Sequence, residues 1–407
     1  MIIVNAEMRK YILITSSNFP QGGPGANYLN LFCRGLKANG AEISVYLLKG
    51  FAFGNAAYHG PAKGSTTQGI PFHYLGFRQR PNFLVLKLAD QLKSFLNLLI
   101  LLSGLVVNRK TSTILLYNSD VFFNFPIHLT AKTFGIRIIK FVAEIIDKSQ
   151  YRKSLIGRMS RTAYMINFRH LNIMSDDLIV FSHYLCNKFT EMGFKEGRIL
   201  IQPNLTDFEY WKVDPIDIKY CVGYSGAPYM KDGLNDLLKA ISILNARGHN
   251  VSLLIVGDAT FGKSLIPSLK MECKRLGVED LVSFTGLVSS DEVKRYLSQC
   301  SVLAITRPDT AQTKAGFPTK LGEYMALGKP VLATKFGDIE KYFKDKDNII
   351  LAECDDPGSI ADKLEWMICN TIETRNIALN GHKVAELLLE YNISMKRILQ
   401  FITKVNQ

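Results

Sequence analysis

The chain has 407 residues, of which 47% are hydrophobic and 21% are charged, and its formal net charge is +13. This length is enough for two or three domains with full cores, and the composition excludes a mostly disordered chain. Residues 1–200 hold 24 Lys and Arg against 10 Asp and Glu, whereas residues 201–407 hold 25 against 26. Residues 51–170 alone hold 16 basic and 4 acidic side chains. We therefore expect two domains, the first with an anionic partner: nucleic acid, a phosphorylated metabolite or a lipid surface.

The predicted elements of the first half alternate between short apolar strands and helical stretches. A glycine loop, 21–26, follows the first strand, and a helix over 27–39 follows the loop. Strands separated by helices indicate βαβ units and a parallel sheet. The predicted strands are 11–15, 42–48, 113–117, 137–142 and 178–181.

The longest apolar run lies in this half and covers Phe95–Val107. Its 13 residues are fewer than the ~20 that span a bilayer, so we predict no transmembrane helix. Lys93, Arg109 and Lys110 flank the run. Two interpretations stay open: a buried helix, or an interfacial helix whose basic flanks contact lipid headgroups.

The seven cysteines are scattered, with no CxxC pair and no Cys/His cluster. This pattern is typical of a reduced, intracellular protein without structural zinc. The first residues do not resemble a signal peptide, because Met1–Glu7 is short and the apolar run that follows resembles a strand. Met8 is an alternative start.

A second α/β series begins after residues 203–217, a stretch with two prolines and four acids that we interpret as an interdomain linker. Two doubly wound halves form a cleft in which ligands bind at the carboxyl ends of the strands. The predicted strands are 220–224, 251–256, 282–284, 302–305 and 330–333, and the predicted helices are 235–245, 264–276, 290–300 and 319–327.

The segment Gly316–Thr334 is the most informative. A turn with Gly316 and Pro318 leads into a helix for which Thr319 is a fair N-cap. The free backbone N–H groups of such a helix start suit a phosphate, and Lys320 would add a point charge. A carboxylate one turn further, Glu323, can accept both hydroxyls of a ribose.

This segment resembles the C-terminal signature of family 4 retaining glycosyltransferases, which have the GT-B fold of two Rossmann-like α/β domains facing a cleft. In that family two glutamates frame the donor site, the first touching the sugar and the second the nucleotide ribose. Glu323 stands at the second position, whereas Ala315 occupies the first. Phe317 matches the aromatic residue between them. Because the first glutamate is missing, the identity of the transferred sugar stays open.

Other segments resemble the family in the same order. Residues 222–233 are similar to the strand and loop whose arginine and lysine hold the donor diphosphate. Lys231 matches the lysine, and Ala227 occupies the arginine position, for which Lys320 or Arg307 can substitute. Further matches are 180–182, 203–207, 253–258 and 284–286.

Two segments of the first half complete the resemblance. Gly22 and Gly23 resemble the glycine loop that faces the donor phosphates, where backbone amides approach a phosphate closely. Glu144 and Asp147 match a strand end where relatives carry Glu-x-His-Asp, with Ile146 at the histidine position. These carboxylates either orient or deprotonate an acceptor hydroxyl, or cap the strand and form ion pairs.

The resemblance implies an acceptor-binding domain over 1–205, with helix 390–407 packed back on it, and a donor-binding domain over 206–389. It also implies a retaining sugar transfer from a nucleotide-diphosphate sugar, without cofactor or metal, to a saccharide or polyprenyl-diphosphate-linked acceptor in bacterial surface-polysaccharide synthesis. The residues implied are catalytic Glu144, Asp147 and Lys231, and donor-binding Gly22, Gly23, Lys231, Arg307, Phe317, Thr319, Lys320, Leu321 and Glu323.

With the basic first domain on an anionic membrane, we expect a cytoplasmic protein, peripheral on the inner face of the cytoplasmic membrane. An inverting GT-B transferase and a sugar-nucleotide epimerase are the alternatives. Nucleic-acid binding is a remote alternative, since no recognition motif is present. ATP hydrolysis has no support, because the sequence contains no P-loop.

Overall fold

The computed structural model describes residues 10–52, 58–107, 112–146, 154–214, 217–260 and 263–403. The chain folds into two compact units. The N-terminal unit comprises Met1–Gln202 and Met395–Gln407, and the C-terminal unit comprises Pro203–Ser394. For comparison, the predicted boundary lies between residues 205 and 206, and the predicted returning helix begins at residue 390.

An eight-stranded sheet forms the centre of the N-terminal unit, in the order β3-β4-β2-β1-β5-β6-β7-β8. All neighbouring pairs are parallel except β3 and β4. The central strands are rich in Ile and Leu, because parallel strands covered by helices are buried on both faces. The strands are Lys10–Thr15 (β1), Glu42–Leu47 (β2), Lys63–Ser65 (β3), Pro71–Tyr74 (β4), Ser112–Tyr117 (β5), Arg137–Val142 (β6), Asp177–Val180 (β7) and Ile199–Ile201 (β8).

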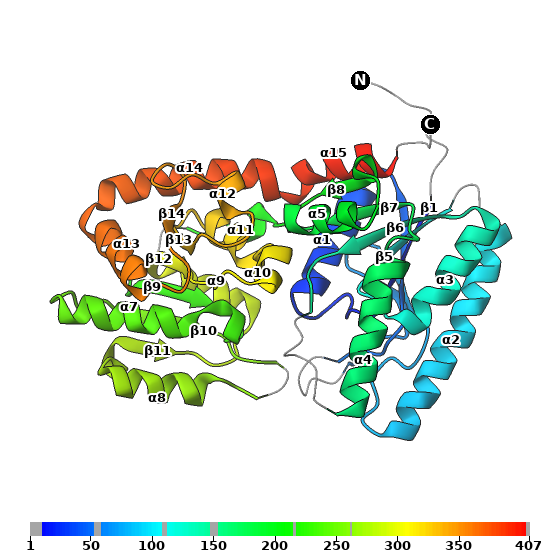
Figure 1. Cartoon of the computed structure of the whole chain (residues 1–407), viewed down its shortest axis with the longest axis horizontal. Helices are drawn as coiled ribbons and strands as arrows, with labels where there is room; N and C mark the ends of the chain where they lie inside the picture. Colours follow the sequence, from blue (N-terminus) through cyan, green and yellow to red (C-terminus); the bar gives the residue numbers. More distant parts are fainter. Residues whose placement is uncertain are drawn as a thin grey trace. The chain divides into compact units, whose positions relative to one another are not determined.

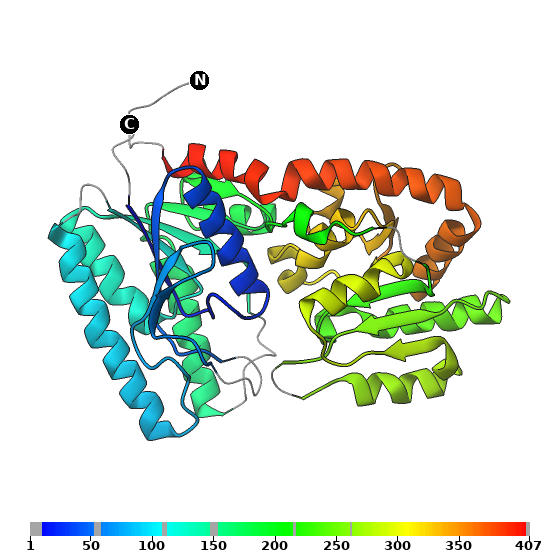
Figure 2. The ribbon, with the colours of Figure 1, turned by 180° about the vertical axis from the view of Figure 1, so that it is seen from behind.

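Helices cover both faces of this sheet. Figures 1 and 2 show α2, α3 and α4 next to one another on one face and α1 on the other. The π-helix η2 continues directly from α4 and packs against α3. The helices are Pro24–Ala38 (α1), Leu84–Val107 (α2), Val121–Phe134 (α3), Leu155–Ile166 (α4), Asn167–Leu171 (η2), His183–Glu191 (α5), Glu196–Arg198 (η3) and Tyr391–Ile402 (α15, whose residues from Met395 onward belong to this unit).

Helix α2 differs from its prediction in length and in exposure. It has 24 residues, because Lys87, Asp90 and Lys93 lie inside the helix and do not end it. By length and composition alone, α2 could cross a membrane. The core helix of a soluble protein can meet the same criterion. The sequence analysis considered only the apolar run Phe95–Val107 and so underestimated the length of this helix; its expectation that the run does not span a membrane stays a prediction.

A narrow stripe of α2 attaches the helix to the sheet. Asp90, Ser94, Leu98, Leu102 and Leu105 are buried, at the three- and four-residue spacing of one helical face. The Phe77 N–H donates to Asp90 Oδ1 at 2.6 Å, and Ser94 Oγ donates to the Leu48 carbonyl at 2.8 Å. The prediction of a buried helix therefore holds for this stripe alone.

A six-stranded parallel sheet forms the centre of the C-terminal unit, in the order β11-β10-β9-β12-β13-β14. A separate hydrophobic cluster packs on each face of it. The strands are Tyr220–Ser225 (β9), Leu253–Val256 (β10), Val282–Phe284 (β11), Cys300–Ile305 (β12), Val331–Thr334 (β13) and Ile350–Ala352 (β14).

The helices of this unit alternate with its strands. They are Phe208–Trp211 (α6), Met230–Asp232 (η4), Leu234–Ala246 (α7), Ile266–Leu276 (α8), Glu279–Leu281 (η5), Ser290–Ser298 (α9), Ala311–Ala315 (α10), Thr319–Ala326 (α11), Ile339–Tyr342 (α12), Pro357–Cys369 (α13) and Thr371–Leu389 (α14).

The stretch 203–217, predicted as the interdomain linker, begins at the boundary between the two units, and its described residues belong to the C-terminal unit. Its short helix α6 places Phe208 and Trp211 in a hydrophobic cluster of this unit, where they are 7% and 8% exposed. The two prolines and the acids suggested a linker, but the two aromatic side chains determine where the segment packs.

Candidate functional site

The ends of two neighbouring strands bring three charged residues together in the C-terminal unit. Strand β9 leads through Gly226 into η4, which ends at Asp232. Strand β12 ends two residues before Arg307, and helix α11 contributes Lys320 from its first turn. Because β9 and β12 are adjacent and parallel, the segments after them meet at the same edge of the sheet. This edge is where ligands bind in open α/β sheets.

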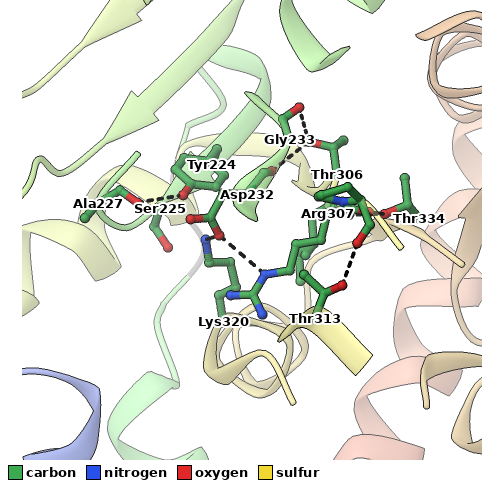
Figure 3. A network of polar contacts seen from close by, with 12 residues as sticks. Tyr224, Ser225, Ala227, Asp232, Gly233, Thr306, Arg307, Thr313, Lys320 and Thr334 are labelled. Atoms are coloured by element: carbon green, nitrogen blue, oxygen red, sulfur yellow. Dashed lines mark hydrogen bonds and ion pairs between the residues drawn. The ribbon is translucent and has the colours of Figure 1, made fainter. Parts of the chain in front are cut away.

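A buried carboxylate stands between two cations at this edge (Figure 3). Asp232 Oδ1 accepts a hydrogen bond from Lys320 Nζ at 3.0 Å and pairs with Arg307 Nε at 3.4 Å. The three side chains are only 3%, 9% and 12% exposed, respectively. We call Asp232, Arg307 and Lys320 the charge cluster.

Burial and neighbouring charge oppose one another in the charge cluster. Burial acts to raise the pKa of Asp232, but the cations of Lys320, Arg307 and Lys231 outweigh it and hold that pKa below its ordinary value. Burial lowers the pKa of Lys320 to about 8, although Asp232 acts in the opposite direction. Asp232 is therefore ionised at neutral pH, and Lys320 keeps most of its charge.

Aromatic and backbone contacts hold the charge cluster in place. Lys320 Nζ lies 4.0 Å from the centre of the Tyr224 ring, a cation–π contact. Thr306 Oγ1 donates to the carbonyls of Asp232, at 3.3 Å, and Gly233, at 3.1 Å. Gly233 has φ +65°, and a Cβ there would lie 1.7 Å from the Thr306 carbonyl oxygen. Only glycine fits, so the loop after η4 is locked against the end of β12.

Glu323 lies one turn beyond Lys320 on α11 and is partly exposed. Burial raises the pKa of its carboxyl group to about 7, and the nearby Lys320 cation acts to lower it. A carboxyl group with this pKa changes charge near neutral pH. As a carboxylate it can accept hydrogen bonds from two hydroxyl groups.

The other residues predicted for the donor site lie beside Lys320, at the start of α11. Thr319 is the first residue of α11, and the N-cap is Pro318, without a side-chain hydrogen bond. Leu321 is fully buried in the core. Phe317 is 5% exposed and packs edge-on against Tyr342, with ring centres 5.9 Å apart. The side chains of Phe317 and Leu321 therefore belong to the core, whereas Thr319 is partly exposed.

Lys231 lies in η4, next to Asp232, and is half-buried. Its cation is one of those that lower the pKa of Asp232. Lys231 therefore adds a third positive charge to the edge that Lys320 and Arg307 occupy.

Three of the residues predicted for the N-terminal unit, Gly22, Gly23 and Glu144, lie in segments that follow β1 and β6. Gly22 has φ +148°, and Gly23 is the N-cap of α1, with Pro24 as the first helical residue. Glu144 follows β6, is exposed and lines a cavity of this unit. Asp147 lies outside the described residues.

Within the described parts of the chain, no group of three or more His, Cys, Asp or Glu is placed to hold a metal ion. The seven cysteines are all free thiols.

Comparisons with known proteins agree on the kind of fold. Residues 219–370 match the model of the family described as "Glycosyl transferases group 1". The HepE protein of Anabaena, solved in complex with UDP, superposes with a TM-score of 0.71 at 17% identity, covering 98% of this chain and 100% of that one. The chain has the GT-B fold.

Two curated relatives match over part of their length. The uncharacterized glycosyltransferase MJ1178 of Methanocaldococcus jannaschii is 26% identical over 221 residues, which are 54% of this chain and 57% of that protein. The capsular polysaccharide biosynthesis glycosyltransferase CapM of Staphylococcus aureus is 24% identical over 207 residues, 49% of this chain and 51% of that protein. The match thus spans a little over half the length of these relatives.

Within this GT-B chain, sequence reasoning missed Asp232, the centre of the charge cluster, although it selected both cations. The available signal was the Lys-Asp-Gly sequence at 231–233, which places a carboxylate directly before a glycine at the end of a strand loop. It also missed Tyr224, whose ring supports Lys320, because a tyrosine at the end of a strand resembles ordinary core.

We expect Asp232→Ala to lower the free energy of unfolding of the C-terminal unit by roughly 3–5 kcal/mol, because two buried cations lose their counter-charge. Asp236→Ala is the matched control. Asp236 pairs at 3.1 Å with the largely exposed Lys239, so its loss should cost less than about 1 kcal/mol. Urea unfolding measures both. Equal effects of the two substitutions would show that the charge cluster has no special role in stability.

Proposed function

We propose that the protein is a glycosyltransferase that moves a sugar from a nucleotide-diphosphate sugar to a saccharide acceptor, with retention of configuration. The observation that carries this proposal is the charge cluster beside Glu323 at the sheet edge of a GT-B fold. Cations there suit a diphosphate, and the carboxylate suits ribose hydroxyls. The family match of residues 219–370 and the resemblance to family 4 enzymes support the same activity.

The donor diphosphate is the natural partner of Lys320 and Arg307. Both are held in place before the donor arrives, so they can stabilise the negative charge that develops on the leaving diphosphate without reorganisation. Lys231 adds to this positive potential. Because these cations supply the charge, we expect transfer without a divalent metal. Asp232 keeps the cations positioned and moderates their charge.

We take UDP-glucose as the first donor to test. HepE of Anabaena, which shares the fold, has been solved with UDP and with UDP-glucose. Relatives named for amylovoran and capsular polysaccharide biosynthesis support a role in bacterial surface-polysaccharide assembly. We propose that the protein lies on the inner face of the cytoplasmic membrane. A lipid-linked acceptor is consistent with this location.

The outer helices of the N-terminal unit support a membrane contact. Leu84, Leu88, Leu92, Leu96 and Ile100 form an exposed stripe on α2 at four-residue spacing, and each is 52–72% exposed. This stripe lies opposite the buried one, so α2 is apolar on two faces. Large exposed apolar patches mark contact surfaces. The adjacent α3 adds exposed Phe122, Phe125, Leu129 and Phe134, and α4 adds Leu155, Met159 and Ile166.

The charges around this apolar surface match an anionic bilayer. The sequences of α2, α3, α4 and η2 contain one acid, Asp90, which is buried. Lys87, Lys93, Lys132 and Arg158 are exposed on the same helices. Each cation near an anionic membrane contributes about 1 kcal/mol of attraction. Because α2 is attached to the sheet, we propose that it lies along the interface and does not span the bilayer.

The transfer reaction itself is tested with UDP-glucose and octyl glycosides as soluble acceptors. We expect a product whose new glycosidic bond keeps the α configuration of the donor, assigned by proton NMR. A β-linked product would contradict retention. Conversion of the sugar nucleotide without any acceptor would identify an epimerase and overturn the proposed transfer.

The affinity for UDP-glucose should depend on Glu323 between pH 6 and 8. The pKa of Glu323 is about 7, so lowering the pH protonates the carboxylate that accepts the ribose hydroxyls. We expect binding to weaken about tenfold from pH 8 to pH 6, as a single ionisation allows. Above pH 8, deprotonation of Lys320, whose pKa is about 8, should weaken binding again.

Isothermal titration calorimetry of Glu323→Gln checks this assignment. This variant should bind UDP-glucose with no loss between pH 8 and pH 6, whereas Glu209→Gln, a change at an exposed glutamate on α6, should keep the wild-type profile. A wild-type profile in Glu323→Gln would remove Glu323 from the donor site.

Membrane contact is tested by sedimentation with liposomes. Wild-type protein should sediment with vesicles that contain anionic lipid and should be released by salt. Leu88→Gln/Leu92→Gln/Leu96→Gln should bind at least tenfold more weakly, because these side chains are 52–60% exposed and face away from the sheet. The control Ile372→Gln/Leu379→Gln/Leu387→Gln removes equally exposed side chains from α14. Equal binding by both variants would contradict an α2 contact.

A further inference from the structure

The two central strands of the C-terminal sheet separate before they end. Strands β9 and β12 pair with one another as far as Gly223 and Leu303. Beyond that point the last two residues of β9 pair with β10, and the last two of β12 pair with β13. The chain also changes direction across the sheet here, because it runs from β9 outward to β10 and β11 and then returns to β12 beside β9. Ligands of open α/β sheets bind at such a switch point.

A tyrosine hydroxyl provides the hydrogen bond that the separated strands no longer make. The Gly226 N–H donates to the Val256 carbonyl, beside β10, at 2.9 Å. Successive N–H groups of a strand point to opposite neighbours, so the Ser225 N–H faces the side of β12. It donates to Tyr324 Oη at 2.7 Å, and Ser225 Oγ donates to the same oxygen at 3.2 Å. The phenol of Tyr324 thus accepts the bond that a β12 carbonyl would accept if the pairing continued.

The burial of this contact gives the hydroxyl a role beyond packing. Tyr324 is 0% exposed and Ser225 is 4% exposed, so water does not compete for the bond. A buried backbone N–H normally has a partner, and here the partner is a side chain 99 positions away in the sequence. A phenylalanine would fill nearly the same space in the core but would leave the Ser225 N–H without its acceptor.

Tyr324 and Lys320 point to the same strand end from one face of α11. They are four residues apart on the helix, so their side chains lie one above the other. Lys320 Nζ lies 4.0 Å from the centre of the Tyr224 ring and 3.0 Å from Asp232 Oδ1. Tyr324 Oη contacts the next residue of the strand, Ser225. The hydroxyl therefore fixes the helix that carries Lys320 against the strand that leads to Asp232.

The backbone after Ser225 lies directly against the Lys320 ammonium group. Gly226 has φ +119°, and a Cβ at this position would lie 3.4 Å from Lys320 Nζ. A shift of the end of β9 would therefore move Gly226 relative to this nitrogen. The same shift would disturb the pair between Lys320 and Asp232, because the strand continues through Gly226 into η4.

We propose that Tyr324 is a positioning residue of the donor site, whose hydroxyl keeps the end of β9 apart from β12 and thereby places the charge cluster for the donor diphosphate. The inference rests on the proposed glycosyl transfer and deepens it. Tyr324 is fully buried, so it acts through Ser225 and α11 and not by contact with the donor. Its hydroxyl should therefore matter for the diphosphate part of the donor and not for the nucleoside part.

The difference in affinity between a nucleoside and its diphosphate tests this role. The probes are uridine and UDP, guanosine and GDP, and thymidine and dTDP, each titrated into the full-length protein by ligand-observed NMR. We expect at least one diphosphate to bind at least tenfold more tightly than its nucleoside. In Tyr324→Phe the affinity for that diphosphate should fall at least fivefold, whereas the affinity for its nucleoside should change less than twofold.

Tyr220→Phe is the matched control, because Tyr220 lies at the amino end of the same strand, away from the charge cluster. It should leave both affinities unchanged. Ser225→Ala removes the longer of the two hydrogen bonds to Tyr324 Oη and should weaken diphosphate binding at least twofold. If a melting curve shows that Tyr324→Phe does not fold, Ser225→Ala carries the test.

The outcomes separate this inference from the proposed function. A merely structural hydroxyl would lower the melting temperature of Tyr324→Phe and leave the ratio of diphosphate to nucleoside affinity at the wild-type value. An unchanged ratio in the variant that carries the test overturns this inference and leaves the transferase proposal standing. Wild-type protein that binds none of the three diphosphates more tightly than its nucleoside overturns the proposed donor site, and this inference with it.

Discussion

The charge cluster depends on one buried carboxylate. Asp232 is the only acid among the groups that hold Lys320 and Arg307 in the described structure, and it joins the loop after β9, the end of β12 and the start of α11. Two cations this close together in a low-dielectric site would repel one another without it. The positions of both cations therefore depend on Asp232, which also opposes the effect of burial on the pKa of Lys320.

In the proposed donor site, this arrangement would select ligands by charge as well as by shape. A dianionic diphosphate can share Lys320 and Arg307 with Asp232, because the cations keep hydrogen-bond donors beyond those that Asp232 uses. A neutral ligand carries no negative charge to attract the cations, so the pairs of Asp232 with Lys320 and Arg307 stay intact. Under the proposed function Glu323 adds a second selection step one turn away, because its pKa of about 7 would make ribose binding depend on pH.

Much of the fold follows from the sequence because the strands are buried on both faces. Runs such as 113–117 and 253–256 contain almost only apolar residues, and these became β5 and β10. Strands β3 and β8 were not predicted, although β11, which also has three residues, was; β3 is Lys-Gly-Ser and carries no apolar side chain. Helix α2 was underestimated because its polar residues Lys87, Asp90 and Lys93 resemble a boundary, whereas Asp90 is buried against Phe77.

The candidate site was predictable only where residues carried a family resemblance. Lys320 and Glu323 lie in a recognisable segment, but the pairing of Lys320 with Asp232 joins residues 88 positions apart. Phe317 matched a pattern, yet its side chain belongs to the core.

The two apolar faces of α2 also limit how this helix can change during evolution. A helix that covers a sheet usually has a solvent face on which substitutions accumulate freely, since surface changes cost little stability. In α2 a substitution in the buried stripe disturbs the packing against the sheet, and one in the exposed stripe alters the outer surface. Few exposed polar positions, such as Lys87 and Lys93, lie outside the two stripes. We therefore expect α2 to vary more slowly among descendants of this gene than its exposure suggests.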